Sequence, residues 1–246
     1  MALLTYLEPG EPFPATSNAL SHPNGLLAAG GSLDTATLLA AYRRGLFPWY
    51  EAPQPILWWS PDPRSVLFPD EFHLAKSLRK TLRNTPLTLS MDSDFEAVVS
   101  ACAAPRARQQ GTWIDDDMRR AYTDLHRQGW AHSVETRGPD GELLGGLYGV
   151  AIGAAFFGES MFSRCSDASK IAFAGLVSFL RERGYALVDC QIESDHMNSL
   201  GARNVSRVDF EECLAHTIDK PMPRDPWNIA PCPADLLTGF EKPAQE

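Results

Sequence analysis

The sequence predicts an α/β protein with a small N-terminal domain at residues 1–65 and a mixed-sheet domain at residues 66–246. Three observations support this prediction. A stretch rich in proline and aromatic residues ends near Ser65, the chain after it alternates between strand-like and helix-like segments, and no segment is repeated. Strands in a meander, followed by alternating helices and strands, are typical of helices packed on a mixed sheet.

The N-terminal part contains one clear helical pattern. Within residues 32–45, Ser32 or Asp34 can cap a helix whose apolar stripe includes Leu38, and Gly45 can end it. The next segment, residues 46–64, is broken by prolines and looks like a loop. It nevertheless carries an unusual density of large aromatic side chains: Phe47, Trp49, Tyr50, Trp58 and Trp59.

The second part alternates between the two patterns. Amphipathic spacing predicts helices at residues 72–84, 92–103, 115–129 and 167–184. Apolar runs predict strands at residues 87–91, 131–137, 142–153, 154–160 and 185–192, with a hairpin turn at Pro139-Asp140-Gly141. We also expect a short helix from about Asp195, a last strand at residues 207–212, and an irregular tail after Lys220.

Composition excludes several classes of protein. The net charge of −9 argues against a chain built around non-specific DNA binding, although a local basic patch can exist within it. The five cysteines are scattered and never form a C-x-x-C pair, which favours neither a disulfide framework nor a zinc site. The chain begins without a signal-peptide pattern and has no apolar run long enough for a membrane span, so we expect a cytoplasmic protein without a membrane part.

One helix carries a concentration of positive charge. No acidic residue occurs between Phe72 and Met91. Helical spacing puts four cations on one face, opposite a leucine stripe: Lys76, Arg79, Lys80 and Arg83. A solvated helix face is the ordinary interpretation, but four uncompensated cations in an acidic chain favour a site for the phosphate backbone of RNA.

The segment "YALVDCQIESDH" has polar residues at the end of a buried strand. Strand alternation puts Asp189 and Gln191 on one face and Cys190 on the other, with Val188. A carboxylate and an amide in such a place need hydrogen-bond partners or a function. Loop amides can satisfy them, or they can form a site, whereas Cys190 is expected to be a small buried hydrophobe.

A second segment, "FFGESMFSR", leads from a strand to the start of the long helix. Acyl-CoA transferases bind pyrophosphate at such a place with a glycine-rich run of backbone N–H groups. This segment has a single glycine, and Glu159 would repel phosphate. A coenzyme A site is therefore disfavoured.

Several segments occur in an order that identifies a family. They are "NGLLAAGGSLDTATLLAAYRRGLFPWY", "ILWWSPDPRSVLFP", "GTWI", "HSVE", "GGLYGVAIGAAFFGESMFSR", "ASK" and "LVDCQ…DH…SLGA". Together, from Asn24 to about Phe210, they resemble the bacterial leucyl/phenylalanyl-tRNA–protein transferases. The resemblance implies a catalytic domain similar to the GNAT acetyltransferase fold, without metal or coenzyme.

The resemblance also implies an activity and its partners. Such an enzyme transfers Leu or Phe from aminoacyl-tRNA to a protein that begins with Lys or Arg, which marks that protein for degradation. Leu-tRNA and Phe-tRNA are the expected donors, with Met-tRNA as a further donor, and the enzyme is expected to act as a monomer.

The reaction is aminolysis of an activated ester. An α-amine has an unperturbed pKa of about 7.7–8.0, so no strong base is required, and positioning is the main task. We expect the carboxylate of Asp189 to accept a hydrogen bond from the Gln191 amide, which would turn the Gln191 carbonyl oxygen toward the attacking amine. The resemblance assigns catalysis to the same pair.

Other site residues follow from the resemblance. Trp49 and Trp113 would hold the 3′-terminal adenosine, with Tyr42, Phe156 and Glu159 close by. Five residues would line the pocket for the donor side chain, although core packing explains each of them equally well: Leu147, Phe173, Leu176, Leu180 and Val188. Some family members carry Phe where this chain has Leu176 and Leu180, so we expect a roomier pocket that prefers Phe over Leu.

The cationic first residue of the acceptor requires negative charge, for which Glu159, Glu193 and Asp195 are candidates. Three other functions stay open. A coenzyme A-dependent N-acetyltransferase shares the expected fold, a non-catalytic tRNA-binding module shares the basic helix, and a cysteine amidase using Cys190 and His196 is the least favoured.

Overall fold

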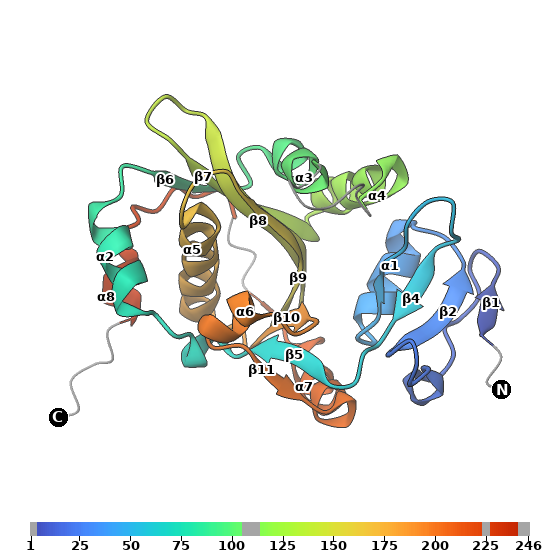
Figure 1. Cartoon of the computed structure of the whole chain (residues 1–246). Coiled ribbons are helices and arrows are strands. Elements are labelled where there is room, and N and C mark those ends of the chain that lie inside the picture. The colour runs from blue at the N-terminus through green and yellow to red at the C-terminus, as the bar shows by residue number, and fades with distance from the viewer. Residues whose placement is uncertain (1–3, 105–113, 223–226, 241–246) are drawn as a thin grey trace.

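A computed structural model of the chain describes residues 4–104, 114–222 and 227–240 (Figure 1). The described residues form two β-sheets with helices packed around them, which confirms the prediction of a mixed α/β protein. The smaller sheet has the strand order β1-β2-β4-β3, and the larger has the order β11-β5-β10-β9-β8-β7-β6.

The smaller sheet is built from the N-terminal part of the chain. Its strands are β1 (Thr5–Leu7), β2 (Leu26–Gly30), β3 (Phe47–Pro48) and β4 (Leu57–Trp59). The segment that looked like a loop therefore contributes two strands. Trp58 is fully buried, and its indole N–H donates to the carbonyl of Gly30 at 2.9 Å, which explains why a buried tryptophan is tolerated there.

Helix α1 (Thr35–Tyr42) begins where the sequence predicts. The side chain of Asp34 accepts a hydrogen bond from the backbone N–H of Thr37 at 2.9 Å, so Asp34 is the N-cap. Gly45 follows the helix with a φ of +71°, a conformation that glycine adopts without strain. Short 3-10 helices occupy Thr16–Asn18 and Pro69–Glu71.

The larger sheet combines antiparallel and parallel pairing. Its strands are β5 (Arg64–Leu67), β6 (Thr88–Met91), β7 (Ala131–Arg137), β8 (Leu143–Ile152), β9 (Ala155–Ser163), β10 (Leu187–Gln191) and β11 (Arg203–Val205). Strands β6 to β9 form an antiparallel meander, and β10 pairs in parallel with β9. The expected hairpin between β7 and β8 is confirmed.

Helices cover both faces of this sheet (Figure 1). Helix α5 (Ala168–Glu182) connects β9 to β10 and packs on β7 and β8, while α3 (Phe95–Ala103) and α4 (Asp116–Arg127) also pack against the sheet. The remaining predicted helices are α2 (Lys76–Asn84) and α6 (Asp195–Ser199), so all five helical segments expected after residue 65 are confirmed.

The prediction of a last strand at residues 207–212 is wrong. The last strand is β11, and residues 207–212 belong to helix α7 (Arg207–Thr217). The Ser206 side chain accepts the backbone N–H of Asp209 at 3.1 Å and so caps the helix. Phe210 and Leu214, four residues apart, are buried on one helix face, and this spacing outweighs the short alternation that suggested a strand.

The tail after Lys220 is not wholly irregular, because it ends in helix α8 (Leu236–Phe240). The domain boundary near Ser65 stays a prediction. One hydrophobic cluster includes Leu38 and Trp58 from the first part and Tyr148 and Phe157 from the second. None of the helices in the described ranges is both long and apolar enough to cross a bilayer.

Candidate functional site

A cavity of about 280 Å³ lies where β9 and β10 separate. The two strands pair from Leu187 with Ala155 to Asp189 with Phe157, after which β9 continues to Ser163 without β10. The cavity is lined by Leu147, Tyr148, Phe156, Gly158, Glu159, Ser160, Met161, Phe173, Leu176, Val188, Asp189, Cys190, Gln191 and Met197. The lining therefore combines apolar side chains with two acidic residues and a glutamine.

Most residues expected around the donor side chain do line this cavity. Leu147, Phe173, Leu176 and Val188 are among its walls, as is Phe156. Leu180 is not. It lies one helical turn beyond Leu176 on α5, about 6 Å along the axis, where it is fully buried in the core.

Asp189 is fully buried and paired with Arg64. The guanidinium donates through Nε to Oδ1 at 2.8 Å and through Nη2 to Oδ2 at 2.6 Å. The rings of Phe47 and Phe210 contact the same guanidinium, with Arg64 Cζ at 4.9 and 4.6 Å from their centroids. Two parallel charge-assisted hydrogen bonds fix this carboxylate in one orientation.

The expected hydrogen bond between the Asp189 and Gln191 side chains is not formed, and that prediction is wrong. Asp189 Oδ1 instead accepts the backbone N–H of Gln191 at 2.9 Å. The Gln191 side chain donates through Nε2 to Glu159 Oε1 at 3.1 Å. The reason is a bulge in β10 opposite β5, where Gln191 takes a φ of +63° and leaves the regular strand alternation.

Glu159 is the centre of a hydrogen-bonded group of neutral donors. Its Oε1 accepts from the hydroxyl of Tyr42 at 2.6 Å, and its Oε2 accepts from the hydroxyl of Tyr122 at 2.6 Å. Burial raises the pKa of Glu159 to about 7, and the charge of Asp189 adds to this, although the hydrogen bonds from the tyrosines and Gln191 act in the opposite direction.

The two tyrosines remain donors at neutral pH, because burial and the Glu159 charge raise the pKa of Tyr42 and Tyr122 well above 10.0. Tyr148 lines the cavity beside them. Its buried hydroxyl has no hydrogen-bond partner among the described residues.

Cys190 packs with Val188 in the apolar cluster beside α5, as strand alternation predicts. Burial raises the pKa of its thiol, so the thiol stays protonated at neutral pH. A protonated thiol is a poor nucleophile, which argues against the cysteine amidase.

Trp49, one of the two tryptophans expected to hold the adenosine, does not line the cavity. Trp49 is 40% exposed and its ring lies 5.6 Å from that of Trp59. Trp113 is outside the described residues. Tyr42 does not line the cavity either and reaches it through Glu159. An adenosine site at Trp49 and Trp113 therefore stays a prediction.

The expected RNA and acceptor residues lie on the surface. On α2 the side chains of Lys76, Lys80 and Arg83 are exposed and Arg79 is half-buried, with Leu78 and Leu82 buried on the opposite face.

Glu193 and Asp195 are exposed and do not line the cavity. Glu193 accepts hydrogen bonds from Asn198 at 3.0 Å and Asn204 at 2.6 Å, which lower its pKa. The acceptor-binding role of these two acids stays a prediction.

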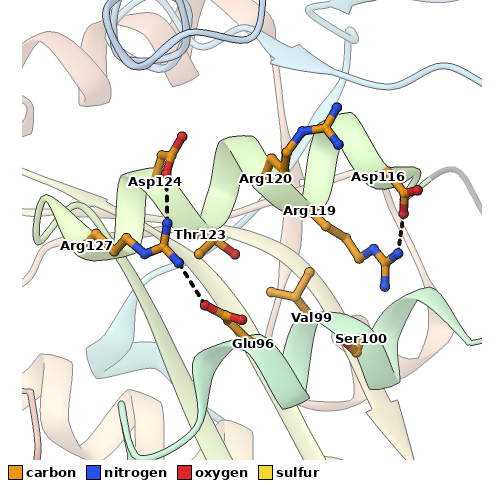
Figure 2. A pocket seen from close by; sticks show the side chains of 9 residues that line it. All are labelled: Glu96, Val99, Ser100, Asp116, Arg119, Arg120, Thr123, Asp124 and Arg127. Carbon is orange, nitrogen blue, oxygen red and sulfur yellow. Dashed lines mark hydrogen bonds and ion pairs between the residues drawn. The ribbon is translucent and has the colours of Figure 1, made fainter.

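A second hollow, of about 350 Å³, lies between α3 and α4 and contains none of the predicted site residues (Figure 2). Its arginines pair with nearby acids. Arg119 pairs with Asp116, and Arg127 pairs with Asp124 at 3.3 Å and Glu96 at 3.2 Å. Compensated charges of this kind make a weak anion site. Within the described ranges, no cluster of three or more His, Cys, Asp or Glu is placed to hold a metal ion.

Comparison with known proteins decides the family. The family model described as leucyl/phenylalanyl-tRNA protein transferase matches residues 66–215, and the model of that family's N-terminal domain matches residues 31–62. The chain belongs to the leucyl/phenylalanyl-tRNA–protein transferase family. It is therefore an enzyme of the aminoacyltransferase class.

Individual relatives agree. The leucyl/phenylalanyl-tRNA–protein transferase of Pseudomonas putida (strain W619) is 59% identical over 209 residues, which covers 85% of this chain and 92% of the relative. The protein of the same name from Azotobacter vinelandii is 55% identical, with 87% of this chain and 94% of the relative covered.

A solved structure, that of L-PGS from Bacillus licheniformis, is 11% identical with a TM-score of 0.38, and covers 68% of this chain and 53% of that chain. This likeness is too distant to carry an argument. The similarity to the GNAT fold stays a prediction.

Sequence reasoning missed several residues of the site, among them Arg64, Tyr122, Tyr148, Met161 and Met197. Arg64 had a usable signal, because a carboxylate at the end of a buried strand needs a cation and this arginine stands directly after Pro61-Asp62-Pro63. The two tyrosines and two methionines have the spacing of ordinary core residues. No local pattern distinguishes them.

Proposed function

We propose that the cavity at the end of β10 binds the aminoacyl end of Leu-tRNA or Phe-tRNA, and that the aminoacyl group moves to the α-amine of a protein beginning with Lys or Arg. The observation that carries this proposal is that one cavity combines apolar walls with Glu159, Asp189 and Gln191. A volume of about 280 Å³ suits a single amino-acid residue. The product would be marked for degradation.

The apolar walls of the cavity account for the choice of donor. Leu147, Phe173, Leu176 and Val188 would surround the Leu or Phe side chain, and each methylene group that they bury contributes about 0.8 kcal/mol. Met-tRNA fits the same proposal, because an unbranched Met side chain adapts to a cavity shaped for Leu.

The polar residues of the cavity account for the reaction. Because Glu159 holds the amide nitrogen of Gln191, the carbonyl oxygen of that amide is left to accept a hydrogen bond from the attacking amine. The amine nitrogen bonds to the ester carbonyl carbon, the bond from that carbon to the tRNA 3′ oxygen breaks, and the amine proton ends on the released oxygen. Positioning of this kind contributes about 7–11 kcal/mol.

Arg64 and Asp189 position Gln191 in this proposal and do not contact the substrate. The Asp189 carboxylate accepts a hydrogen bond from the backbone N–H of Gln191, and the Arg64 guanidinium donates to the same carboxylate. The φ of +63° at Gln191 is unusual for a residue with a side chain, and the buried ion pair stabilises it. Asp189 is thus a positioning residue in this proposal, rather than a group that touches the amine.

The exposed cations of α2 would bind the phosphates of the tRNA, and Glu193 and Asp195 would attract the cationic acceptor residue. Replacing Lys76, Lys80 and Arg83 together by Ala should weaken tRNA binding and reduce its salt dependence, since each lost phosphate contact lowers the salt slope by about 0.9 for a duplex. We further propose that the enzyme acts as a monomer in the cytoplasm. Light scattering measures the molar mass in solution and so tests the monomeric state.

The decisive experiment mixes the enzyme, Phe-tRNA carrying labelled Phe, and an acceptor protein that begins with Arg. Label should appear at the acceptor N-terminus with the wild type, and it should be lost with Gln191→Ala or with an acceptor that begins with Ala. Binding of the tRNA without transfer of label would refute the proposal and favour a non-catalytic tRNA-binding module.

A further inference from the structure

The tail of the chain lies beyond the family match and yet packs against the site. The match ends at residue 215, whereas the described tail spans residues 227–240. The carbonyl of Ile229 accepts the backbone N–H of Met91 at 2.8 Å, which fixes the tail to the edge strand β6. Helix α8 then packs on α5 and α2 (Figure 1).

Trp227 is the best-anchored residue of the tail. Its ring stacks on that of His132 with centroids 3.9 Å apart and planes 6° apart, and His132 Nδ1 lies 2.7 Å from Asp92 Oδ2. The ring of Phe179 lies 4.4 Å away. These contacts hold the indole in one orientation.

Trp227 also contacts a wall of the cavity. Its ring lies 5.9 Å from that of Phe156, with planes 28° apart. Phe156 is 1% exposed and lines the cavity, whereas Trp227 does not line it, so Trp227 contacts the cavity wall and not its interior.

A second row of aromatic rings repeats this arrangement. Phe240 of α8 lies 5.0 Å from Phe72, and Phe72 lies 6.0 Å from Phe173, which is another wall of the cavity. The tail thus supports two aromatic walls from behind, through two separate rows of rings.

We propose that the C-terminal tail sets the size of the donor pocket, with Trp227 acting through Phe156 and Phe240 acting through Phe72 and Phe173. This inference rests on the proposed function, because it assumes that the cavity binds the donor side chain. Protein interiors are close-packed, so a wall ring cannot recede while the space behind it is filled. Trp227 and Phe240 are therefore positioning residues that determine specificity without touching substrate.

The test compares Trp227→Ala with Trp227→Phe. Removing the indole opens space into which Phe156 can move, so the pocket should fit Leu less closely than Phe. We expect the ratio of kcat/KM for Phe-tRNA to that for Leu-tRNA to rise about threefold to tenfold, which is at or below the lower limit of the roughly 10–200-fold that one methylene group is worth in an apolar pocket. The change should appear in KM for Leu-tRNA more than in kcat, and Trp227→Phe should restore the wild-type ratio.

Leu237→Ala is the matched control. Leu237 is buried in the same tail and the same apolar cluster, but it belongs to neither row of rings. This variant should lower the melting temperature while its donor ratio stays within about twofold of the wild type, as for a distant site. If Trp227→Ala does not fold, Trp227→Leu and Phe240→Leu provide the same measurement.

Phe156→Ala separates the two proposals. A shifted donor ratio in Phe156→Ala, together with an unchanged ratio in Trp227→Ala and Phe240→Leu, overturns the role of the tail and leaves the proposed function intact. An unchanged donor ratio in both Phe156→Ala and Phe173→Ala means that the donor side chain binds elsewhere, and the proposed function of this cavity then fails. A ratio that shifts equally in Leu237→Ala reduces the effect to general destabilisation and also overturns the proposal.

Discussion

Asp189 and Glu159 are two carboxyl groups on neighbouring parallel strands, and their surroundings differ completely. Asp189 faces the guanidinium of Arg64, which forms two charge-assisted hydrogen bonds with it. Glu159 faces two tyrosine hydroxyls and one amide, all of them neutral donors. The first carboxylate is compensated by a full opposite charge, and the second is not.

The difference separates a carboxylate with a buried counter-charge from a carboxyl group whose partners are all neutral. Breaking a buried ion pair is strongly destabilising, because removing one partner leaves the other charge uncompensated. A partly buried carboxyl group with neutral donors has a pKa of about 7 and therefore changes its charge in the range where the enzyme would work. Gln191 is held by both, through its backbone by Asp189 and through its side chain by Glu159.

The largest expected effect comes from breaking the ion pair. Arg64→Met leaves the Asp189 carboxylate buried without a cation, so the free energy of unfolding should fall by about 3–5 kcal/mol. Urea denaturation followed by circular dichroism measures this. The control is Arg203→Met on the adjacent strand β11, because Arg203 pairs with Glu71 at the surface, with both side chains 51% exposed.

The control variant Arg203→Met should lower the free energy of unfolding by less than about 1 kcal/mol, as is usual when an exposed ion pair is broken. The double variant Arg64→Met/Asp189→Leu removes both charges and should regain stability without regaining transfer activity. Equal losses of unfolding free energy in Arg64→Met and Arg203→Met would show that the buried ion pair contributes no more to stability than a surface ion pair.

The next effect is on the reaction rather than on stability. Gln191→Ala removes the amide that would orient the attacking amine, and kcat/KM for transfer should fall on the order of 100-fold, the lower range for a group that handles a proton in the transition state. The lost hydrogen bond to Glu159 is worth only about 1 kcal/mol, so the protein should stay folded. A Gln191→Ala protein that loses stability but keeps its kcat would contradict the role of Gln191 in orienting the attacking amine.

Glu159 gives the third prediction, in the pH dependence of stability. Its pKa is raised from 4.5 to about 7 in the folded protein, so between these values the unfolded chain loses the proton while the folded protein keeps it. Stability contributed by the raised pKa is complete below pH 4.5, falls as pH rises toward 7, and then levels off. The wild type should lose on the order of 2 kcal/mol relative to Glu159→Gln across this window.

Urea denaturation of both proteins at several pH values measures the difference. Tyr122→Phe sharpens the test, since it removes a hydroxyl that lowers the pKa of Glu159. The window should then extend to higher pH. Parallel stability curves for wild type and Glu159→Gln would mean that Glu159 is ionised throughout and that burial has little effect on it.

The sequence predicted five of the seven strands of the larger sheet, β6 to β10, because their signals are local, whereas β5 and β11 were missed. The turn at Gly141 and the apolar face of α5 each depend on neighbours within a few residues, as does the cap at Asp34 before α1. The strands of the smaller sheet were missed because their partners are distant, as with Leu26 and Trp59. Prolines obscured the short strands further.

The sequence predicted many residues of the candidate site but not the hydrogen bonds between them. Asp189, Gln191, Glu159 and four of the five expected pocket residues do come together around one cavity. What failed was the choice of partner for each polar group. Strict strand alternation predicted a hydrogen bond between the side chains of Asp189 and Gln191. The strand instead contains a bulge that no local sequence pattern indicates. Asp189 therefore pairs with Arg64, 125 positions earlier, and the Gln191 amide donates to Glu159.

Cys190 follows Asp189 in the chain and lines the same cavity, and its substitution gives the smallest expected effect. Its thiol has a raised pKa and packs beside Val188, so it should stay protonated and take no part in transfer. Cys190→Ala should therefore keep kcat/KM within about twofold and lower the free energy of unfolding by about 1 kcal/mol, the cost of a small cavity. Iodoacetamide should alkylate the exposed Cys165 of the native protein and leave Cys190 unmodified, as mass spectrometry can show. Loss of transfer in Cys190→Ala would instead revive a cysteine nucleophile, because neither carboxylate depends on this side chain for a hydrogen bond.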